Sequence, residues 1–452
     1  MTELLKHTAE RAARYLDGLD SRLVVPLPEA VERLPQLDGP LPERPADPES
    51  VLALLDDVGS PATVATAGGR FFGFVVGGSL PAALAANWLA GAWDQCAGLA
   101  VMSPVAAALE DIALRWLLDV LALPPECGGG FVTGATMANF TSLAAARHAV
   151  LEKVGWDVEA DGLVGAPPIT VVVGAEAHAS VLKALGMLGL GRKRVVVVPA
   201  DGQGRMRADA MPRLSGPTII CLQAGNVNTG AFDPAGEICP IAHEAGAWVH
   251  VDGAFGLWAA AAPQRAYLTA GFAEADSWAT DAHKWLNVPY DSGLAFVRSE
   301  QHLRAAMALI AAYLPPGDKR DPDAYTPEAS RRARGAEIWA ALRSLGRSGV
   351  ADLVERTCRY AARLADGLRA AGYQILNDVV INQVLVSFGD AETTRRVMAA
   401  IQADGTCWCG GTVWQGHVAM RISVSSWVTT EADIDRSLEA MVRIARSTIE
   451  KR

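Results

Sequence analysis

Lys284 is the residue in this chain whose type and setting most directly suggest chemistry. It lies in the run Asp281-Ala-His283-Lys284-Trp285. A lysine amine becomes a nucleophile only when it loses its proton, and desolvation or a neighbouring cation favours that loss. His283 and the tryptophan could supply such surroundings. A lone lysine is more often a solvated surface residue, so its role depends on what the chain places beside it.

A carboxylate could complement this lysine from the end of another strand. Asp252 closes the apolar run Trp248-Val-His-Val-Asp252, and ligands of open α/β sheets bind at the carboxyl ends of the strands. An anion in that position would stabilise a protonated ring nitrogen, because an adjacent opposite charge favours the cation. The alternatives are a helix cap or a metal ligand, since a strand followed by aspartate is common.

Two more strand ends carry polar residues in front of helices. Gly134-Ala135-Thr136 opens a helix, so its free N–H groups and the helix dipole could hold a phosphate. The alternative there is a plain turn capped by Thr136. His178 follows a strand and could lie on a planar ring or move protons. Its alternative is a histidine at a helix start that bonds to the backbone.

The order of these four features decides between the alternatives. A phosphate cradle, a ring-stacking histidine, a strand-end aspartate and a lysine follow one another. Asp252 and Lys284 are about thirty residues apart, the size of one strand–helix unit. The order suits a cofactor with a phosphate, a protonated ring nitrogen and an aldehyde, which are the groups of pyridoxal 5'-phosphate (PLP). The sequence therefore predicts a PLP site in which Lys284 is the Schiff-base lysine.

Short β-rich runs alternate with Ala/Leu-rich helical segments and would position these residues. Strands are expected at residues 130–133, 169–174, 194–199, 218–222, 248–252 and 294–298. Runs that are apolar on both faces and alternate with helices indicate a parallel sheet covered on both sides. Helices at 334–345 and 351–371 and strand-like runs at 383–388 and 417–423 follow. They predict a smaller C-terminal α+β domain.

The 452 residues allow two or three domains. We expect an N-terminal helical and proline-rich arm at residues 1–80, a large cofactor-binding domain at 81–336 and a small domain at 337–452. The long apolar stretch at residues 81–102 contains Asn87, Asp94 and Gln95. Polar residues near a bilayer centre are costly, so a buried helix is expected there rather than a membrane span.

Composition narrows the function classes. The formal net charge is -10, which argues against a nucleic-acid groove, since such a groove needs clustered Lys and Arg. The seven cysteines are expected to be free thiols in a reducing compartment, with a cytoplasmic location. Cys407, Cys409 and His417 lack a second ligand pair at finger-like spacing, so no metal site is expected. The N-terminus lacks an apolar signal core.

From about Arg70 onward the sequence resembles the group II PLP-dependent amino-acid decarboxylases, which include aromatic-L-amino-acid, glutamate and histidine decarboxylases. The matching segments are Phe71-Phe-Gly-Phe74, Ser103-Pro104 with Glu110, Phe131–Asn139 (FVTGATMAN), Ala177-His-Ala-Ser180, Gly225-Asn226, Phe232-Asp233, Val249–Ala254 and Asp281–Trp285. The resemblance implies fold type I, with a mostly parallel seven-stranded-type sheet covered by helices. It also implies a homodimer with shared active sites. The apolar helix from Pro81 and the proline-rich arm are suitable material for that interface, and the alternative is that both pack within one subunit.

The resemblance also implies roles for particular residues. The catalytic set would be Lys284, His178 and Asp252. The residues that contact the cofactor would be Ala135, Thr136, His178, Asn226, Asp252, Ala254, His283 and Lys284. The expected activity is decarboxylation of an L-amino acid, with a lean toward an aromatic substrate from Phe71, Phe72, Phe74 and Trp93.

Two departures from the family pattern affect the activity. Relatives carry a mobile loop with a tyrosine that returns a proton after CO2 leaves, and the matching stretch at residues 313–325 looks shortened, with Tyr325 as a candidate. Without that tyrosine, an aminotransferase or an aldehyde-forming relative of the same fold is the alternative. In addition, Val75-Val-Gly-Gly78 replaces bulkier or hydroxyl-bearing residues, so substrate specificity does not transfer.

Overall fold

The computed structural model describes residues 1–309 and 320–450, and the chain divides into two compact units. The larger unit comprises residues 79–361 and 377–384, and the smaller one residues 1–78, 362–376 and 385–452. The N-terminal arm therefore belongs to the same unit as the C-terminal part of the chain. The three-part domain division expected from the sequence stays a prediction. No helix in the described ranges is both long and apolar enough to cross a membrane.

A seven-stranded sheet forms the centre of the larger unit, in the order β1-β7-β6-β5-β4-β2-β3. Its strands are β1 (Gly128–Val132), β2 (Thr170–Gly174), β3 (Val196–Val198), β4 (Thr218–Gln223), β5 (Trp248–Asp252), β6 (Ser277–Asp281) and β7 (Gly293–Val297). The five strands from β6 to β3 pair in parallel, whereas β7 is antiparallel to both β6 and β1. The predicted α/β class and mostly parallel sheet are confirmed.

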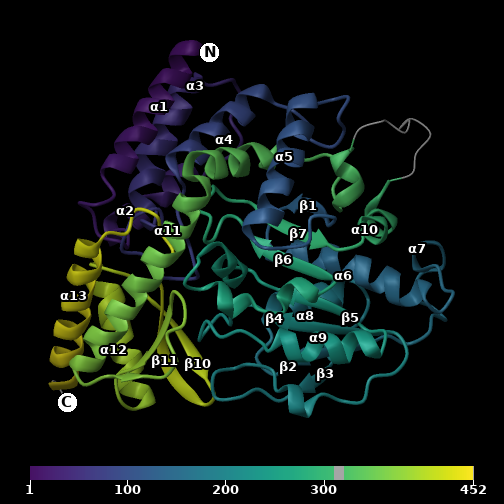
Figure 1. Ribbon diagram of the computed structural model, residues 1–452. Helices are drawn as coiled ribbons and strands as arrows, with labels where there is room; N and C mark the ends of the chain where they lie inside the picture. The colour runs from purple at the N-terminus through teal and green to yellow at the C-terminus, as the bar shows by residue number, and fades with distance from the viewer. Residues whose placement is uncertain (310–319, 451–452) are drawn as a thin grey trace. The chain divides into compact units, whose positions relative to one another are not determined.

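Helices cover this sheet on both faces (Figure 1). The helices of this unit are α4 (Pro81–Trp93), α5 (Pro104–Val120), α6 (Ala135–Glu152), α7 (Val158–Asp161), α8 (Ala179–Met187), α9 (Ala235–Glu244), α10 (Glu300–Met307) and the first part of α11 (Arg334–Ala370). Helix α6 packs across β5, β6 and β7, and the small side chains along it allow this close approach. One core cluster joins α6 and α8 to alternate residues of β2 and β4, such as Val171, Val173 and Ile219.

The helix expected at residues 81–102 is present as α4, but it is not buried within the chain. Ala83 is its only buried residue. Trp88, Leu89 and Trp93 are 47%, 56% and 41% exposed. The prediction of a buried helix was therefore wrong for the single chain: its apolar residues face outward instead of packing into the core.

The smaller unit contains a four-stranded sheet in the order β10-β11-β9-β8. Its strands are β8 (Gln374–Ile375), β9 (Gln383–Ser387), β10 (Gly410–Trp414) and β11 (His417–Ser423); its helices are α1 (Thr2–Asp17), α2 (Pro28–Glu32), α3 (Pro48–Leu54), α12 (Ala391–Asp404), α13 (Glu431–Glu450) and the end of α11. Strands β9 and β11 match the two predicted runs. Gly346 breaks α11 with a φ of 61°, where the sequence predicts two separate helices.

Candidate active site

The carboxyl ends of β5 and β6 lie side by side and carry the two central carboxylates. Asp252 ends β5, Asp281 ends β6, and the two strands pair in parallel. Strand β6 was not predicted as a strand, because Ser277, Thr280 and Asp281 make it polar in sequence. The structure buries all five of its residues. Lys284 follows three residues after this strand end, so the sheet brings the lysine and Asp252 to the same edge.

Asp252 is 4% exposed and is surrounded by hydrogen-bond donors. Its Oδ2 accepts from Asn139 Nδ2 (3.2 Å) and Ser180 Oγ (3.4 Å), and its Oδ1 accepts from the backbone N–H of Ala254 (3.2 Å). Three donors stabilise the charged form of a carboxylate and fix its orientation. These bonds present an oriented carboxylate at the end of β5.

Asn139 connects Asp252 to a buried chain of polar groups that the sequence does not reveal. Its Oδ1 accepts from His250 Nε2 (2.8 Å), and His250 Nδ1 lies 3.0 Å from Ser277 Oγ. Ser277 Oγ in turn accepts from the indole of Trp248 (2.9 Å). Burial lowers the pKa of His250 to about 3, so its imidazole is neutral and donates through Nε2. The only sequence signal for this chain was a histidine within an apolar strand.

His178 is the N-cap residue of α8. Its Nδ1 accepts from the backbone N–H of Ser180 (3.2 Å) and lies 2.8 Å from Ser180 Oγ. The helix-start alternative is therefore realised. The same ring also lines a small cavity together with Asp252. The cap fixes the imidazole at the cavity instead of leaving it free to rotate.

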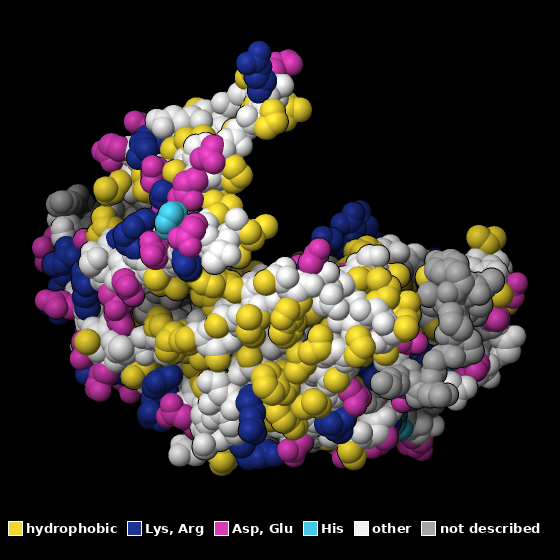
Figure 2. Space-filling view, turned by 90° about the horizontal axis from the view of Figure 1, so that it is seen from above, with side chains coloured by type: hydrophobic (Ala, Val, Ile, Leu, Met, Phe, Trp, Pro, Cys, Tyr) yellow, Lys and Arg dark blue, Asp and Glu magenta, His cyan; other side chains and the backbone are white. Residues whose placement is uncertain are grey.

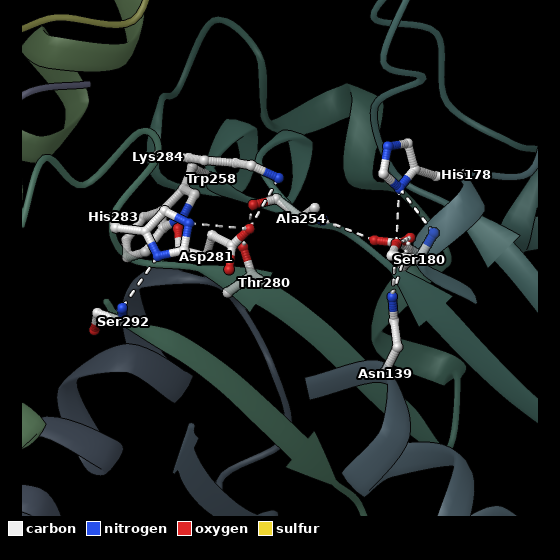
Figure 3. Close-up of polar contacts among 11 residues, drawn as sticks. Asn139, His178, Ser180, Ala254, Trp258, Thr280, Asp281, His283, Lys284 and Ser292 are labelled. Atoms are coloured by element: carbon white, nitrogen blue, oxygen red, sulfur yellow. Dashed lines mark hydrogen bonds and ion pairs between the residues drawn. The ribbon is translucent and has the colours of Figure 1, made fainter. Parts of the chain in front are cut away.

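Lys284 forms an ion pair with a buried partner. Its Nζ lies 2.8 Å from Asp281 Oδ2; the two side chains are 19% and 2% exposed. His283 Nε2 lies 3.7 Å from the same oxygen, and its Nδ1 accepts from the backbone N–H of Ser292 (3.1 Å). Figure 3 shows Lys284, Asp281 and His283 grouped on one side, with Ala254 between them and the group of His178, Ser180 and Asn139.

The N-terminus of α6 comes close to this group. The helix begins at Ala135 after Gly134, so Thr136 lies in the first turn rather than capping it, and no side chain caps this end. A side chain at Gly134 would lie 3.1 Å from His283 Cε1 and 3.4 Å from Asp281 Oδ1. A Cβ at Gly293, the first residue of β7, would lie 2.4 Å from Gly134 Cα. Two glycines thus let the turn approach Asp281 and His283.

Asn226 holds the loop after β4. It is 1% exposed. Its Oδ1 accepts from the N–H groups of Asn228 (2.8 Å) and Thr229 (3.2 Å), and its Nδ2 donates to Gln223 Oε1 (2.9 Å) and to the carbonyl of Glu176 (3.4 Å). These bonds occupy both donors and both acceptor positions of the amide. The expected contact between Asn226 and the cofactor stays a prediction.

Tyr325, the candidate loop tyrosine, is 3% exposed and belongs to the α6–α8 core. Its hydroxyl donates to Glu300, and the guanidinium of Arg320 lies 4.0 Å from its ring centre. Burial and Glu300 raise its pKa to about 12. These contacts give Tyr325 a packing role. The other tyrosine of the stretch, Tyr313, lies outside the described residues.

Comparison with known proteins places this site in a family. The family model for the pyridoxal-dependent decarboxylase conserved domain matches residues 32–389. The chain belongs to the pyridoxal-dependent decarboxylase family. It is 30% identical over 386 residues to L-2,4-diaminobutyrate decarboxylase of Rhizobium meliloti, covering 80% of this chain and 75% of that protein. It is 26% identical over 411 residues to tryptophan decarboxylase 1 of Oryza sativa, covering 82% and 79%.

The fold agrees with that family. A crystal structure of Oryza sativa TDC with PLP and tryptamine superposes with a TM-score of 0.91 at 22% identity, covering 99% of this chain and 97% of that one. The protein is a PLP-dependent carboxy-lyase. The site fits the cofactor. Among residues 1–309 and 320–450, no side chain caps the N-terminus of α6 and no group bonds the buried Asp281 Oδ1, and the site adds a donor-bound carboxylate and a lysine amine.

Proposed function

We propose that this protein removes the α-carboxyl group of an L-amino acid, with PLP held on Lys284 as a Schiff base. The observation that carries the proposal is the position of the lysine. Lys284 lies at the end of β6 beside buried Asp281, and Asp252 lies at the end of the adjacent strand β5. A nucleophilic amine and a fixed anion at neighbouring strand ends match the aldehyde and the ring nitrogen of one cofactor.

The residues around this pair would hold the rest of the cofactor. The free N–H groups at Ala135 and Thr136 would bind the phosphate, because a helix N-terminus favours an anion. His283, next to that turn, would contact the same end. Ala254, whose N–H bonds Asp252, and Asn226 would lie beside the ring. Each of these assignments follows the family pattern and the position of the residue at the sheet edge.

Bound PLP supplies an electron sink for the pair of electrons that the departing carboxylate leaves behind. Asp252 would keep a proton on the ring nitrogen, because its fixed negative charge favours the protonated form. His178, held by the cap of α8, would lie against the ring. Lys284 would anchor the cofactor before and after each turnover.

For the substrate we propose an aromatic L-amino acid as the first candidate. Phe71 and Phe72 are 5% and 1% exposed and so belong to the core. Phe74 and Trp93 are 63% and 41% exposed. The choice therefore rests on the family resemblance and on relatives such as tryptophan decarboxylase 1 of Oryza sativa.

The alternative activity, aminotransfer or aldehyde formation, is favoured by one observation. Tyr325 is buried and bound to Glu300, which leaves the family's proton-returning tyrosine without a match among the described residues. A carbanion that is not protonated at Cα can be diverted to another product. This alternative predicts an aldehyde or a keto acid in place of an amine.

The test is incubation of the purified protein with PLP and single L-amino acids: aromatic ones, acidic ones and 2,4-diaminobutyrate. We expect CO2 and the corresponding amine from at least one of them. Lys284→Ala should abolish both the yellow lysine-bound cofactor and the CO2. Lys183→Ala, which removes an exposed lysine of α8, should change neither. No CO2 from any amino acid despite bound PLP would refute the proposal.

We also propose a homodimer built on α4. Exposed apolar patches on a monomer mark interaction surfaces, and Trp88, Leu89 and Trp93 are followed by Val101 and Met102, which are 85% and 56% exposed. Figure 2 views the molecule from above the view of Figure 1 and shows hydrophobic side chains gathered on that face. A second copy of the chain would cover them, in keeping with the twofold interfaces of most oligomers.

Light scattering tests the dimer. The unmodified chain should have twice the mass of one copy, and Trp88→Glu with Trp93→Glu should give monomers. A fully active monomer at micromolar concentration would contradict this part of the proposal. A cytoplasmic location is proposed as well, since all seven cysteines are free thiols and thiols persist in reducing compartments.

A further inference from the structure

We propose that Asp281 is a catalytic residue that takes the proton which Lys284 must lose before it can attach to the cofactor. This inference rests on the proposed role of Lys284. The family pattern in the sequence assigns no function to Asp281, and this inference gives it one. The argument comes from the contacts of Asp281, from the charges around it and from the chemistry of imine formation.

Asp281 is fixed in place and nearly sealed from solvent. Its N–H donates to the carbonyl of Ala254 (2.9 Å), and its own carbonyl accepts from the indole of Trp258 (3.1 Å). Its side chain is 2% exposed. Oδ2 faces Lys284 Nζ at 2.8 Å, while Oδ1 is buried and has no hydrogen-bond partner in the described part of the chain. A carboxylate held this way has one oxygen on the lysine and one oxygen free.

The only cation that balances this carboxylate in the described part of the site is Lys284. His283 lies 3.7 Å away, but burial, the largest effect on it, lowers its pKa even though Asp281 and Asp291 act in the opposite direction. Its imidazole is therefore neutral at neutral pH. The negative charge of Asp281 contributes to raising the pKa of Tyr290, after burial, so that phenol also stays neutral. Charge balance in this pocket depends on the lysine.

Attachment to the cofactor begins with the loss of the lysine's positive charge. Lys284 reacts only as the neutral amine, and a buried carboxylate left without its cation is costly. Both problems are solved when Lys284 passes one proton to Asp281 Oδ2. The neutral amine then forms a carbon–nitrogen double bond with the aldehyde carbon. Its two remaining protons leave with the aldehyde oxygen as water. Asp281 would be a neutral carboxylic acid during this step, and its proton would then pass to the imine nitrogen, so that no charge is stranded.

The neutral acid also suits the neighbouring phosphate site. Asp281 Oδ1 lies 3.4 Å from the position of a Cβ at Gly134, the residue before the proposed phosphate-binding turn. A charged carboxylate beside a phosphate would be repulsive, whereas a carboxylic acid can donate a hydrogen bond. When a substrate amine releases Lys284, the same proton can return to the lysine and restore the 2.8 Å ion pair.

The experiment compares cofactor attachment with cofactor binding. Cofactor-free protein is mixed with PLP, and the absorbance of the lysine-bound form is followed in a stopped flow. Binding without attachment is measured with pyridoxine 5'-phosphate, which has an alcohol in place of the aldehyde. The variants are Asp281→Asn, which keeps the shape, and Asp281→Ala. The control is Asp276→Asn, which removes a carboxylate located just before β6 that bonds Val249 and His243.

We expect Asp281→Asn to attach PLP about a hundredfold more slowly, at the low end of general acid–base effects, and to bind pyridoxine 5'-phosphate as well as the unmodified protein. Formate should restore attachment in Asp281→Ala, since it can occupy the space of the lost carboxylate. Asp276→Asn should attach PLP at the normal rate.

Two results would overturn the inference. One is normal attachment by Asp281→Asn. The other is an equal loss of attachment and of pyridoxine 5'-phosphate binding in both Asp281 variants without rescue by formate, which would indicate a structural role. A failure of the proposed function would give a different result in the same experiment. The unmodified protein would then form no bond to PLP that depends on Lys284.

Discussion

Replacement of Asn139 by leucine tests whether the buried polar chain supports the site. Leucine has nearly the same shape as asparagine but can neither donate nor accept. The change removes the hydrogen bond to Asp252 Oδ2 (3.2 Å) and the bond from His250 Nε2 (2.8 Å). Asn139 and His250 are both 0% exposed, so water cannot replace the lost partners without opening the core.

The size of the effect follows from the bonds to Asp252 and His250. A third bond of Asn139, to Ser180 Oγ (3.3 Å), uses the same donor nitrogen as the bond to Asp252. A buried donor left without an acceptor costs about 1–3 kcal/mol, and His250 Nε2–H becomes such a donor. Asp252 still accepts hydrogen bonds from Ser180 and from the N–H of Ala254. It therefore loses only one charge-assisted hydrogen bond, which is worth about 1.5–3 kcal/mol. We expect the free energy of unfolding to fall by about 3–5 kcal/mol. PLP affinity should fall as well, because Asp252 is then less firmly oriented.

Urea unfolding of the cofactor-free protein and PLP titration measure the two effects. Asn139→Leu should lower both stability and affinity, whereas Ser142→Ala, three residues along α6 with a single 3.3 Å bond to the carbonyl of Trp278, should lower stability slightly and leave affinity intact. A loss of less than 1 kcal/mol with unchanged PLP affinity would show that the chain from His250 to Asp252 does not hold the site together.

Three further changes test other parts of the molecule. Burial raises the pKa of Glu337 from 4.5 to about 7. The contribution of this group to the free energy of unfolding is therefore complete below pH 4.5, and up to about 3 kcal/mol of it is lost as pH rises through 7. Glu337→Gln should flatten the pH dependence of stability in urea between about pH 5 and 8, and an unchanged slope would contradict this. Tyr325→Phe should lower stability by about 1 kcal/mol and leave the ratio of amine to aldehyde unchanged; a shift in that ratio would make Tyr325 a proton donor. Gly293→Ala should weaken PLP binding at least tenfold, because its Cβ would displace Gly134. Gly236→Ala should not, because its Cβ meets nothing within 4 Å. Equal PLP binding by both variants would refute the role of the turn.

The sequence predicts most of the sheet because its strands carry a strong apolar signal. Strand β5 was predicted with its observed limits, since its run is apolar on both faces, and Asp252 stands out at its end. Strand β6 has three polar residues among its five and gives no such signal, yet it is fully buried. Its burial comes from pairing with β5 and β7, which is a tertiary effect. For α4 the sequence left two outcomes open, a subunit interface or packing within one subunit, because an apolar pattern shows that a helix avoids water but not which surface covers it.

The residues that act directly could be proposed from their places at strand ends, but the residues that support them could not. Asn139 meets His250 and Asp252 across 111 and 113 positions of sequence. Such contacts have no local pattern, because a buried amide in an Ala-rich helix looks like any other polar residue. The ion pair of Asp281 and Lys284 spans three positions and was visible in principle. Its meaning depends on burial, which only the fold supplies.

The two strand-end carboxylates therefore have different capacities, although the sequence presents them alike. Asp252 accepts hydrogen bonds from three donors, which fix the orientation of its carboxylate independently of Lys284. Asp281 is paired with Lys284 and keeps one oxygen without a hydrogen-bond partner among the described residues, so the lysine is the group that balances its charge. Carboxylates placed in contrasting environments commonly divide the roles of anion and acid. If Asp281→Asn and Asp252→Asn failed in the same way, with equal effects on attachment and on analogue binding, this division of roles would be wrong.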